Sequence, residues 1–358
     1  MRIRAERDDL ADVLSRAARA VGTRSALPVL SGIMVEVVGK TLRVTGTDLE
    51  VTIRTELEVE VMEEGRTVIP ARLATEAVRK LPPGAVVLQA GEGEVEITGG
   101  GPRFRLREMS VEDFPKIAEP DLEGSVEIDG AAFAEALGQV SVAASTDDAR
   151  PILTGVYFEY EAGALRVVAT DSYRLAVRNV PAVTAELSGL VPVRALKELG
   201  RTIGADSLQV ALGTREATFA SARGTLTARL IEGSFPNYRQ LIPDSYPNRL
   251  TVSRAALLES IDRASLVAED HIPIRMHLQD GGAELSVTRQ DVGGETEHVE
   301  GVYEGEEMTI AFNSRYLGDG VAALEGDDVV LEVLDPLKPG VLRGSGEDFL
   351  YLLMPVRL

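Results

Sequence analysis

The feature that most constrains the fold of this chain is an internal repeat. The segments "GTDLEVTIR" (46–54) and "ATDSYRLAVR" (169–178) share a Thr-Asp pair followed by an alternating strand pattern. Their aspartates, Asp48 and Asp171, lie 123 residues apart. A period this long far exceeds the roughly 20–50 residues of solenoid repeats, so each copy is expected to be a whole domain.

Further landmarks recur in the same order at nearly the same spacing. "LPVLSGIMVEV" (27–37) returns as "RPILTGVYFEY" (150–160), "VIPARLATEAVRKL" (68–81) as "LVPVRALKELGRTI" (190–203), and "EDFPKI" (112–117) as "GSFPNY" (233–238). A fainter third copy contains "VSRAALLESIDRASLVA" (252–268) and "IAFNSRYLGDGVAAL" (310–324). The sequence therefore predicts three domains, 1–120, 121–245 and 246–358.

Each copy combines two helical patterns with many short strands. The first helix of a copy has a continuous apolar face, which comprises Leu10, Val13, Leu14, Ala17, Ala18 and Val21 in copy one and Phe133, Ala136, Leu137, Val140 and Ala144 in copy two. The second helix is predicted from Leu73, Ala77, Val78 and Leu81 in copy one and from Leu196, Leu199 and Ile203 in copy two. Segments such as "TLRVTG" and "EVEITG" alternate with a period of two, which is typical of strands. The expected fold class is α+β with largely antiparallel sheets.

Residue patterns for enzymatic chemistry are missing. The chain contains no cysteine, and the spacing of His271, His277 and His298 fits no metal-ligand pattern. The glycine-rich stretches match no phosphate-binding loop and are interpreted as hairpin turns. We expect no catalytic residues, no metal and no cofactor, although the many carboxylates leave a carboxylate-dependent hydrolase as an alternative. Without an apolar leader or a long apolar run, the chain is expected in the cytoplasm rather than in a membrane.

The positive charge is concentrated on the predicted helices. A net charge of −20 by itself argues against nucleic-acid binding. However, the equivalent helices of copies one and two are both biased toward Arg and Lys, so an acidic protein could present one basic surface. The alternative is that these side chains simply solvate exposed helix faces. The candidate DNA-facing residues are Arg24, Arg72, Arg79, Lys80, Arg194, Lys197 and Arg201.

The segment "ATDSYRLAVR" looks catalytic at first sight, but the repeat suggests otherwise. Asp171 has a counterpart in Asp48, which is followed by Leu49-Glu50-Val51 instead of Ser172-Tyr173-Arg174. A Thr-Asp pair that both copies share is best explained as a turn whose short side chains bond local backbone groups. The function is therefore expected in the residues that differ between the copies.

With these features established, the chain resembles the bacterial DNA polymerase III β-subunit family, the replication sliding clamps. The resemblance rests on the three homologous domains together with "ATDSYRLAVR", "GSFPNYRQLIP" (233–243) and the terminal "YLLMPVRL" (351–358). It implies a head-to-tail homodimer that closes into a ring around duplex DNA, with helices lining the hole and strands forming the outer layer. It also implies docking of polymerase subunits, the clamp loader and repair proteins through short peptides, without catalysis. A paralogous clamp with a specialised or drug-resistance role remains an alternative.

The resemblance implies a peptide-binding cleft between the second and third domains. Where many relatives carry Gly and then His or Tyr after the aspartate, this chain has Ser172-Tyr173, so its peptide preference is left open. The implied cleft residues are Arg150, Leu153, Thr170, Ser172, Tyr173, Arg174, Leu175, Pro236, Gln240, Leu241, Asn313, Tyr316, Leu352, Leu353, Met354, Pro355, Val356 and Arg357.

The resemblance also implies a dimer interface made by an edge of the first domain and an edge of the third. The first edge would carry Arg103, Phe104, Arg105 and Leu106, and the second would carry Leu266, Val267, Glu295 and Glu297. Arginines that face glutamates around an apolar centre form a complementary contact.

Overall fold

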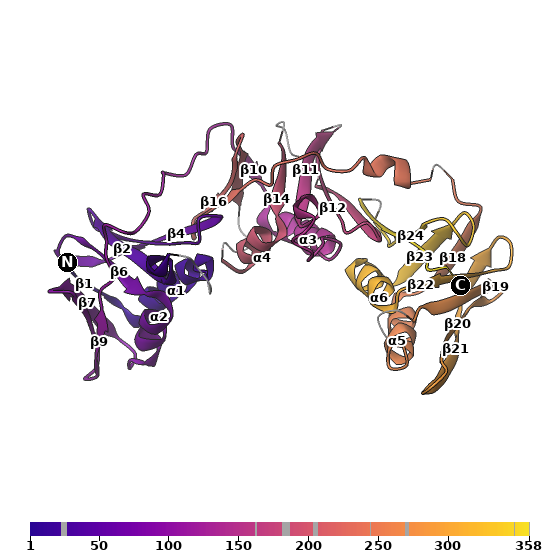
Figure 1. Ribbon diagram of the computed structural model, residues 1–358, viewed down its shortest axis with the longest axis horizontal. Coiled ribbons are helices and arrows are strands. Elements are labelled where there is room, and N and C mark those ends of the chain that lie inside the picture. The colour runs from indigo at the N-terminus through magenta and orange to yellow at the C-terminus, as the bar shows by residue number, and fades with distance from the viewer. Residues whose placement is uncertain are drawn as a thin grey trace. The chain divides into compact units, whose positions relative to one another are not determined.

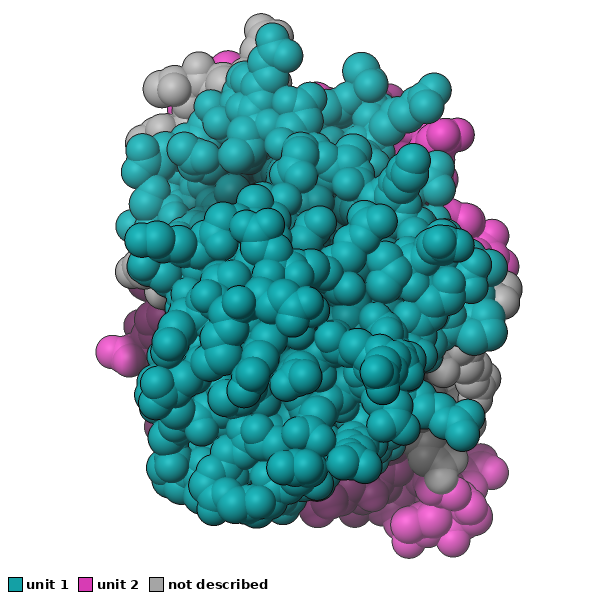
Figure 2. Space-filling view, turned by 90° about the vertical axis from the view of Figure 1, so that its left-hand side faces the viewer, with its two compact units in different colours: residues 1–131, 194–230 teal, residues 132–193, 231–358 magenta. Residues whose placement is uncertain are grey.

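The computed structural model describes residues 1–22, 27–161, 163–180, 187–202, 207–243, 245–268, 272–346 and 348–357. It divides into two compact units, of which unit 1 comprises Met1–Ala131 with Arg194–Leu230 and unit 2 comprises Ala132–Val193 with Ile231–Leu358. Unit 1 is the teal surface of Figure 2. The second sequence copy contributes to both units, so the division into three domains at residues 120 and 245 stays a prediction.

Unit 1 contains two sheets. The five-stranded sheet has the order β5 (Glu60–Glu63), β1 (Arg2–Glu6), β7 (Ala85–Gly91), β8 (Glu94–Thr98) and β9 (Arg103–Arg107). The eight-stranded sheet has the order β10 (Val126–Ile128), β15 (Leu208–Leu212), β16 (Glu216–Ser221), β17 (Gly224–Arg229), β4 (Val51–Glu58), β3 (Thr41–Thr47), β2 (Gly32–Val38) and β6 (Arg66–Pro70). The β4–β17 pairing, with Arg54 opposite Thr225, joins strands from the first two sequence copies.

Unit 2 contains one twelve-stranded sheet. Its order is β14 (Ser188–Pro192), β11 (Gly155–Glu161), β12 (Ala164–Thr170), β13 (Arg174–Val180), β25 (Phe349–Leu353), β24 (Gly340–Arg343), β23 (Asp328–Val333), β18 (Asn248–Ser253), β21 (Gly293–Glu304), β20 (Gly282–Arg289), β19 (Ile274–Gln279) and β22 (Met308–Phe312). Here β13 pairs with β25, so the sheet continues from the second copy into the third.

The strand pairings are antiparallel throughout the part of the chain that the structure describes, as predicted. Strands such as β18 and β23 bury every second residue, because successive side chains point to opposite faces of a sheet. This alternation places a row of Val and Leu side chains against the helices and leaves the other face half-exposed.

The described residues also form six α-helices, two for each sequence copy. They are α1 (Arg7–Ala17), α2 (Ala71–Lys80), α3 (Gly130–Ser141), α4 (Val193–Thr202), α5 (Arg254–Ser265) and α6 (Ser314–Ala323). Within unit 1, α1 and α2 lie side by side, and within unit 2, α5 and α6 do the same (Figure 1). Local chemistry fits these helices: Asp8 and Asp9 favour the N-terminal turn of α1, and the Asn313 side chain caps α6 by accepting from the Tyr316 N–H at 3.0 Å.

The predicted apolar face of the first helix is confirmed, because Leu10, Leu14 and Ala17 are fully buried in the core of unit 1. One predicted core residue is wrong: Leu73 on α2 is 55% exposed. Ala74 occupies the buried position instead, since the face of α2 that meets the sheets runs through Ala71, Ala74, Ala77 and Val78. Ile203, predicted on the second helix of copy two, lies outside the described residues.

Over the residues described, the structure contains no helix that is both long and apolar enough to span a membrane.

Candidate functional site

The turn between β12 and β13 is built by the Thr-Asp pair, as the repeat predicted. The Asp171 carboxylate accepts from the backbone N–H groups of Tyr173 and Arg174 at 2.9 and 3.0 Å, and the Thr170 hydroxyl donates to the Arg174 carbonyl at 2.6 Å. These bonds hold Ser172 at a φ of +82°, which is unusual for a residue with a side chain.

The same turn occurs in the first copy. Asp48 accepts from the N–H groups of Glu50 and Val51 at 3.1 and 2.8 Å, and Leu49 has a φ of +76°. The turn geometry is therefore a property of the repeat. The side chains carried by the turn distinguish the second copy.

Arg174 forms the buried centre of the site. It is 6% exposed, and its Nε donates to Asp171 Oδ2 at 2.9 Å while its Nη1 donates to Asp319 Oδ2 at 2.5 Å and to the Tyr351 hydroxyl at 3.3 Å. Its guanidinium carbon lies 4.3 Å from the centroid of the Tyr316 ring. A buried charge is tolerated when it is paired and hydrogen-bonded, and a planar guanidinium can satisfy several partners at once. Asp171 is thus more than a turn residue, because its second oxygen orients this arginine.

Burial and the contacts in this network shift the pKa values of Arg174, Tyr316 and Tyr351. Burial alone would lower the pKa of Arg174, but its interactions with Tyr351, Asp319 and Asp171 raise it above the ordinary arginine value. Burial raises the pKa of both Tyr351 and Tyr316. Arg174 therefore stays charged, paired with two carboxylates and flanked by two neutral phenols, and neither the guanidinium nor the phenols are set up to transfer a proton near neutral pH.

The C-terminal tail lies against this turn. The Met354 N–H donates to the Tyr173 carbonyl at 2.9 Å, and the Val356 N–H donates to the Ala311 carbonyl at 2.8 Å. The tail is thereby held on both sides by backbone bonds, in contrast to a frayed chain end. Pro355 between them has no N–H to satisfy.

Tyr173 provides the exposed surface of the turn. Its side chain is 57% exposed and its ring stacks on Tyr316, with the centroids 6.3 Å apart. A half-exposed aromatic pair beside an apolar tail is a surface suited to an apolar peptide side chain.

The second linker, which we define as residues 231–243, packs on the same sheet. Its Tyr238 belongs to a buried cluster with Leu175, Val177 and Leu352, against which Met354 also packs. Phe235 stacks on Tyr157 with a centroid distance of 5.1 Å. The Tyr238 hydroxyl donates to Glu159 Oε1 at 2.9 Å, and burial raises the pKa of Tyr238 to about 12. The linker thus covers the sheet next to the turn and the tail.

The structure brings together only part of the predicted cleft. Direct contacts join Thr170, Ser172, Tyr173, Arg174, Asn313, Tyr316 and Met354 and connect them to Leu175 and Leu352. Arg150 reaches the edge of this group through Nη1, which donates to the Ser172 hydroxyl at 3.3 Å. Leu153 and Leu353 are buried nearby in the fold, whereas Pro236, Gln240, Leu241 and Arg357 are exposed and Pro355 and Val356 half-buried.

Sequence reasoning missed three members of the site, namely Asp319, Tyr351 and Tyr238. Asp319 and Tyr351 bond Arg174, and Tyr238 forms part of the apolar cluster. Asp319 and Tyr351 both lie in conspicuous segments, Tyr351 in "YLLMPVRL" and Asp319 in "IAFNSRYLGDGVAAL", but their contacts with Arg174 depend on the packing of α6 and β25 against β13. Tyr238 carried a signal, since it follows the repeated Phe-Pro pair of the linker.

The predicted DNA-facing residues lie on exposed positions of α2 and α4, but several have acidic partners. Arg72 bonds Glu76 at 2.9 Å, Arg201 bonds Glu198 at 3.1 Å, and Arg194 pairs with Asp48. Arg79 donates to the Ser15 hydroxyl at 2.6 Å, while Lys80 and Lys197 have no carboxylate partner among the described residues. Arg24 lies outside the described residues.

Each of the two predicted interface sets includes a sheet edge, whereas Leu266 and Val267 follow the end of α5. In the described part of the chain, β9 pairs only with β8, and residues 293–300 of β21 pair only with β20. On β9, Arg103 and Arg105 are exposed and approach Glu96 at 3.5 and 3.4 Å, while Phe104 and Leu106 pack against the core.

The second of these edges carries an incompletely satisfied carboxylate. Glu297 is paired with Arg263 at 2.7 Å, whereas Oε2 of Glu295 is buried without a hydrogen-bond partner. Burial and the charge of Glu297 raise the pKa of Glu295. Leu266 is 86% exposed and Val267 is half-buried. A buried acceptor without a donor indicates that a further group can complete this edge.

Within the described residues, no group of three or more His, Asp and Glu side chains could hold a metal ion.

Comparisons with known proteins decide the family. The chain matches the N-terminal, central and C-terminal domains of the DNA polymerase III beta subunit over residues 1–118, 127–237 and 239–357. The chain belongs to this family. Its three clamp domains give the α+β class expected from the repeat, and its function is that of a DNA sliding clamp, a replication processivity factor and not an enzyme.

Individual relatives agree with this assignment. The chain is 33% identical to the beta sliding clamp of Streptomyces coelicolor, with 100% of both chains covered. It is 32% identical to the beta sliding clamp homolog GriR of Streptomyces muensis, covering 100% of this chain and 99% of that one. It superimposes on the crystal structure of the DNA polymerase III subunit beta from Pseudomonas aeruginosa with a TM-score of 0.95 at 27% identity over 100% of both chains.

Proposed function

We propose that two copies of this chain form a head-to-tail ring that encircles duplex DNA and tethers replication and repair proteins to it in the cytoplasm. Membership in the sliding-clamp family supports DNA and protein partners in general. The ring, its stoichiometry and the individual contacts are the parts that we propose here.

The charge distribution supports sliding rather than tight binding. A clamp that is held topologically needs only enough positive charge to tolerate phosphates, because high affinity would impede its movement. Several candidate DNA-facing arginines are already paired with carboxylates, which moderates their attraction to phosphate. The net charge of −20 discourages adsorption to DNA from other surfaces.

The two sheet edges support the head-to-tail dimer. An edge strand with unpaired backbone groups is a template for pairing with another chain. In the proposed ring, Arg103 and Arg105 of one copy face Glu295 and Glu297 of the other. This arrangement provides a donor for the unsatisfied carboxylate of Glu295.

One observation carries the docking proposal: the tail and the turn after β12 share the Met354–Tyr173 backbone bond, which combines Tyr173, Tyr316 and Met354 in one surface. We infer that a short peptide from a partner lays apolar side chains on these residues and on the exposed Leu241. Arg174 beneath them orients the site through its fixed charge. The partner peptide could bind this site either as a helix or as an extended segment, with only a few apolar anchor residues.

The decisive experiment compares retention on circular and linear DNA. The clamp is loaded by its cognate loader onto a nicked circle, and free protein is removed by gel filtration. We expect the clamp to remain on the intact circle and to leave after a restriction enzyme cuts it. Equal retention before and after cutting would exclude topological tethering.

Deleting residues 354–358 tests the docking site separately. The truncated clamp is expected to stay dimeric and to be retained on the circle, but to lose binding of a labelled peptide from the cognate polymerase. Loss of the dimer would instead make the tail a structural element.

A further inference from the structure

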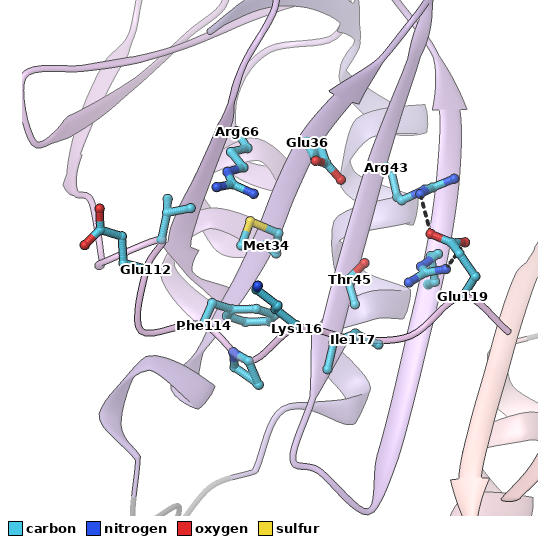
Figure 3. Close-up of a pocket in the computed structure, with 13 residues that line it drawn as sticks. Met34, Glu36, Arg43, Thr45, Arg66, Glu112, Phe114, Lys116, Ile117 and Glu119 are labelled. Atoms are coloured by element: carbon cyan, nitrogen blue, oxygen red, sulfur yellow. Dashed lines mark hydrogen bonds and ion pairs between the residues drawn. The ribbon is translucent and has the colours of Figure 1, made fainter.

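A second pocket lies in unit 1, between residues 110–120, which we call the first linker, and the face of the sheet formed by β2, β3, β4 and β6. Figure 3 shows Met34, Glu36 and Arg66 on the sheet side of this space and Phe114, Lys116 and Ile117 on the linker side. Its volume is about 460 Å³, within the range of roughly 300–1,000 Å³ of typical ligand pockets. We call it the linker pocket.

The floor of the linker pocket is apolar. Phe114 is 6% exposed and forms a cluster with Val29, Leu30 and Val68, against which Met34 and Ile117 pack. This cluster anchors the first linker to the sheet, so the pocket has a fixed floor. Burial of an apolar side chain of a ligand against this floor would be favourable.

Cations surround this floor. Arg43, Arg54, Arg66 and Lys116 line the pocket together with Glu36, Glu112 and Glu119, although the whole chain has 57 acidic and 37 basic residues. Two of the cations are paired: Glu119 accepts from Arg43 at 3.1 Å and from Arg54 at 2.6 Å, and Glu56 accepts from Arg43 at 2.9 Å. Arg66 and Lys116 are exposed and have no ion pair within the described structure.

Arg54 adds an unsatisfied donor. It is 8% exposed and uses its two terminal nitrogens on Glu119 and on the Ala118 carbonyl, whereas its Nε is buried without a partner. A buried donor of a charged group without an acceptor is costly, and an acceptor that enters the pocket would relieve that cost.

The repeat shows that the pocket is specific to the first copy. The second linker crosses the equivalent sheet face, but there Tyr238 and Arg239 fill the space by bonding Glu159, the counterpart of Glu36. The first linker has Ile117 and Ala118 at those positions. Conversely, the second copy has the apolar Val177 where the first has Arg54. The sheet face of the second copy is thus filled by its own linker, whereas that of the first copy is open and carries two cations, Arg66 and Lys116, without an ion pair within the described structure.

We propose that the linker pocket binds a short extended segment of a partner protein that carries an apolar side chain next to carboxylates. The apolar side chain lies on Phe114 and Ile117, and the carboxylates pair with Arg66 and Lys116 or accept from Arg54. This site is separate from the docking site of unit 2, so a clamp subunit would present two peptide sites of different chemistry.

The test uses isothermal titration of the full-length clamp with the tripeptides acetyl-Phe-Asp-Asp amide and acetyl-Phe-Asn-Asn amide. We expect the acidic peptide to bind roughly five- to thirty-fold more tightly, because it can form two charge pairs that the neutral peptide lacks. No binding of the acidic peptide at millimolar concentration, or equal binding of both peptides, would overturn the proposal.

Four variants test whether the binding occurs in the pocket. Arg66→Glu with Lys116→Glu should weaken binding of the acidic peptide at least about ten-fold, whereas the matched reversal of Arg2 and Lys40, two exposed cations elsewhere in unit 1, should not. Ile117→Tyr introduces the side chain that the second linker carries at the equivalent position, Tyr238. It should fill the pocket and block binding without changing any charge. Deletion of residues 354–358 should leave the binding intact. Unchanged binding in both pocket variants, or its loss on tail deletion, would place the peptide elsewhere.

Discussion

The guanidinium of Arg174 is held between Asp171 and Asp319, with nitrogen–oxygen distances of 2.9 and 2.5 Å. Asp171 comes from the turn that carries Arg174, and Asp319 comes from α6 of the third sequence copy. The contact therefore connects the turn after β12 to a helix 145 residues further along the chain. It positions Tyr173 and Tyr316, on which the proposed docking site depends.

Removal of this charge should destabilise unit 2. We expect Arg174→Ala to lower the free energy of unfolding by about 3 kcal/mol, because it leaves the buried carboxylate of Asp171 without its guanidinium partner. Arg150→Ala is the control, since Arg150 is exposed and so are its partners Asp147 and Ser172, and it should change stability by less than about 0.5 kcal/mol. Thermal melts of both variants give the comparison. A similarly small loss of stability in both variants would mean that water can replace the contacts of Arg174.

Tyr173 should contribute to docking and not to folding. Because its side chain is 57% exposed, Tyr173→Ala should change stability by less than about 0.5 kcal/mol. The same variant should weaken binding of a labelled polymerase peptide about ten-fold, measured by fluorescence anisotropy, through the loss of the aromatic surface. Tyr173→Phe keeps the stacking on Tyr316 and should bind like the unchanged protein. Unweakened binding by Tyr173→Ala would show that Tyr173 is not part of the docking site.

Exchanging the charges on the two sides of the proposed interface tests it. Replacing both Arg103 and Arg105 with Glu should weaken the dimer about 100-fold, or roughly 2.7 kcal/mol, because like charges would then face each other. Replacing Glu295 and Glu297 with Arg in the same chain should restore the dimer. Analytical ultracentrifugation across micromolar concentrations measures both steps. A dimer that tolerates the first change would show that the contact lies on other edges.

The carboxyl pair Glu135 and Glu325 should make unit 2 sensitive to pH. The hydrogen bond with Glu325, together with burial, holds the pKa of Glu135 above its usual range, and the same bond with the charge of Arg178 holds the pKa of Glu325 below it. A carboxyl with a raised pKa stabilises the fold below its unfolded pKa, and this contribution is lost as the pH rises through its folded value. The carboxyl with the lowered pKa contributes above its unfolded pKa and loses that contribution as the pH falls through its folded value.

Glu135→Gln keeps a donor for Glu325 without the charge. We expect it to raise the melting temperature above about pH 5 and to have little effect near pH 4, where Glu135 is itself protonated. The gain should be no more than about 0.5 kcal/mol, since the side chains are 47% and 51% exposed. Glu284→Gln, at an exposed position on β20, serves as the control. A gain that is the same at pH 4 and pH 7 would contradict the shared-proton explanation.

Gly46 should be essential for packing α1 on the sheet. A Cβ at this position in β3 would lie 2.0 Å from the Ala17 carbonyl oxygen at the end of α1, so either the strand or the helix must shift. We expect Gly46→Ala to cost about 3 kcal/mol, whereas Gly91→Ala in β7, where nothing lies within 4 Å, should cost less than about 0.5 kcal/mol. Equal melting temperatures would show that α1 can move away without loss.

The sequence by itself determined the repeated units, the α+β class, the helices and the Thr-Asp turns. These follow from local patterns: apolar periodicity, strand alternation and short side chains that bond their own backbone. The one wrong core residue, Leu73, has a local reason as well: it lies about 100° around α2 from Ala74, and the buried stripe runs through Ala71, Ala74, Ala77 and Val78.

Only the tertiary structure decided which side chains meet. Asp319 and Tyr351 contact Arg174 because β13 pairs with β25 across the border between two sequence copies, and no local pattern encodes that pairing. The linker pocket likewise depends on the space left by Ile117 where its counterpart Tyr238 fills the equivalent face. Sequence periodicity depends on residues that are close along the chain, whereas these sites form where segments distant in sequence pack together.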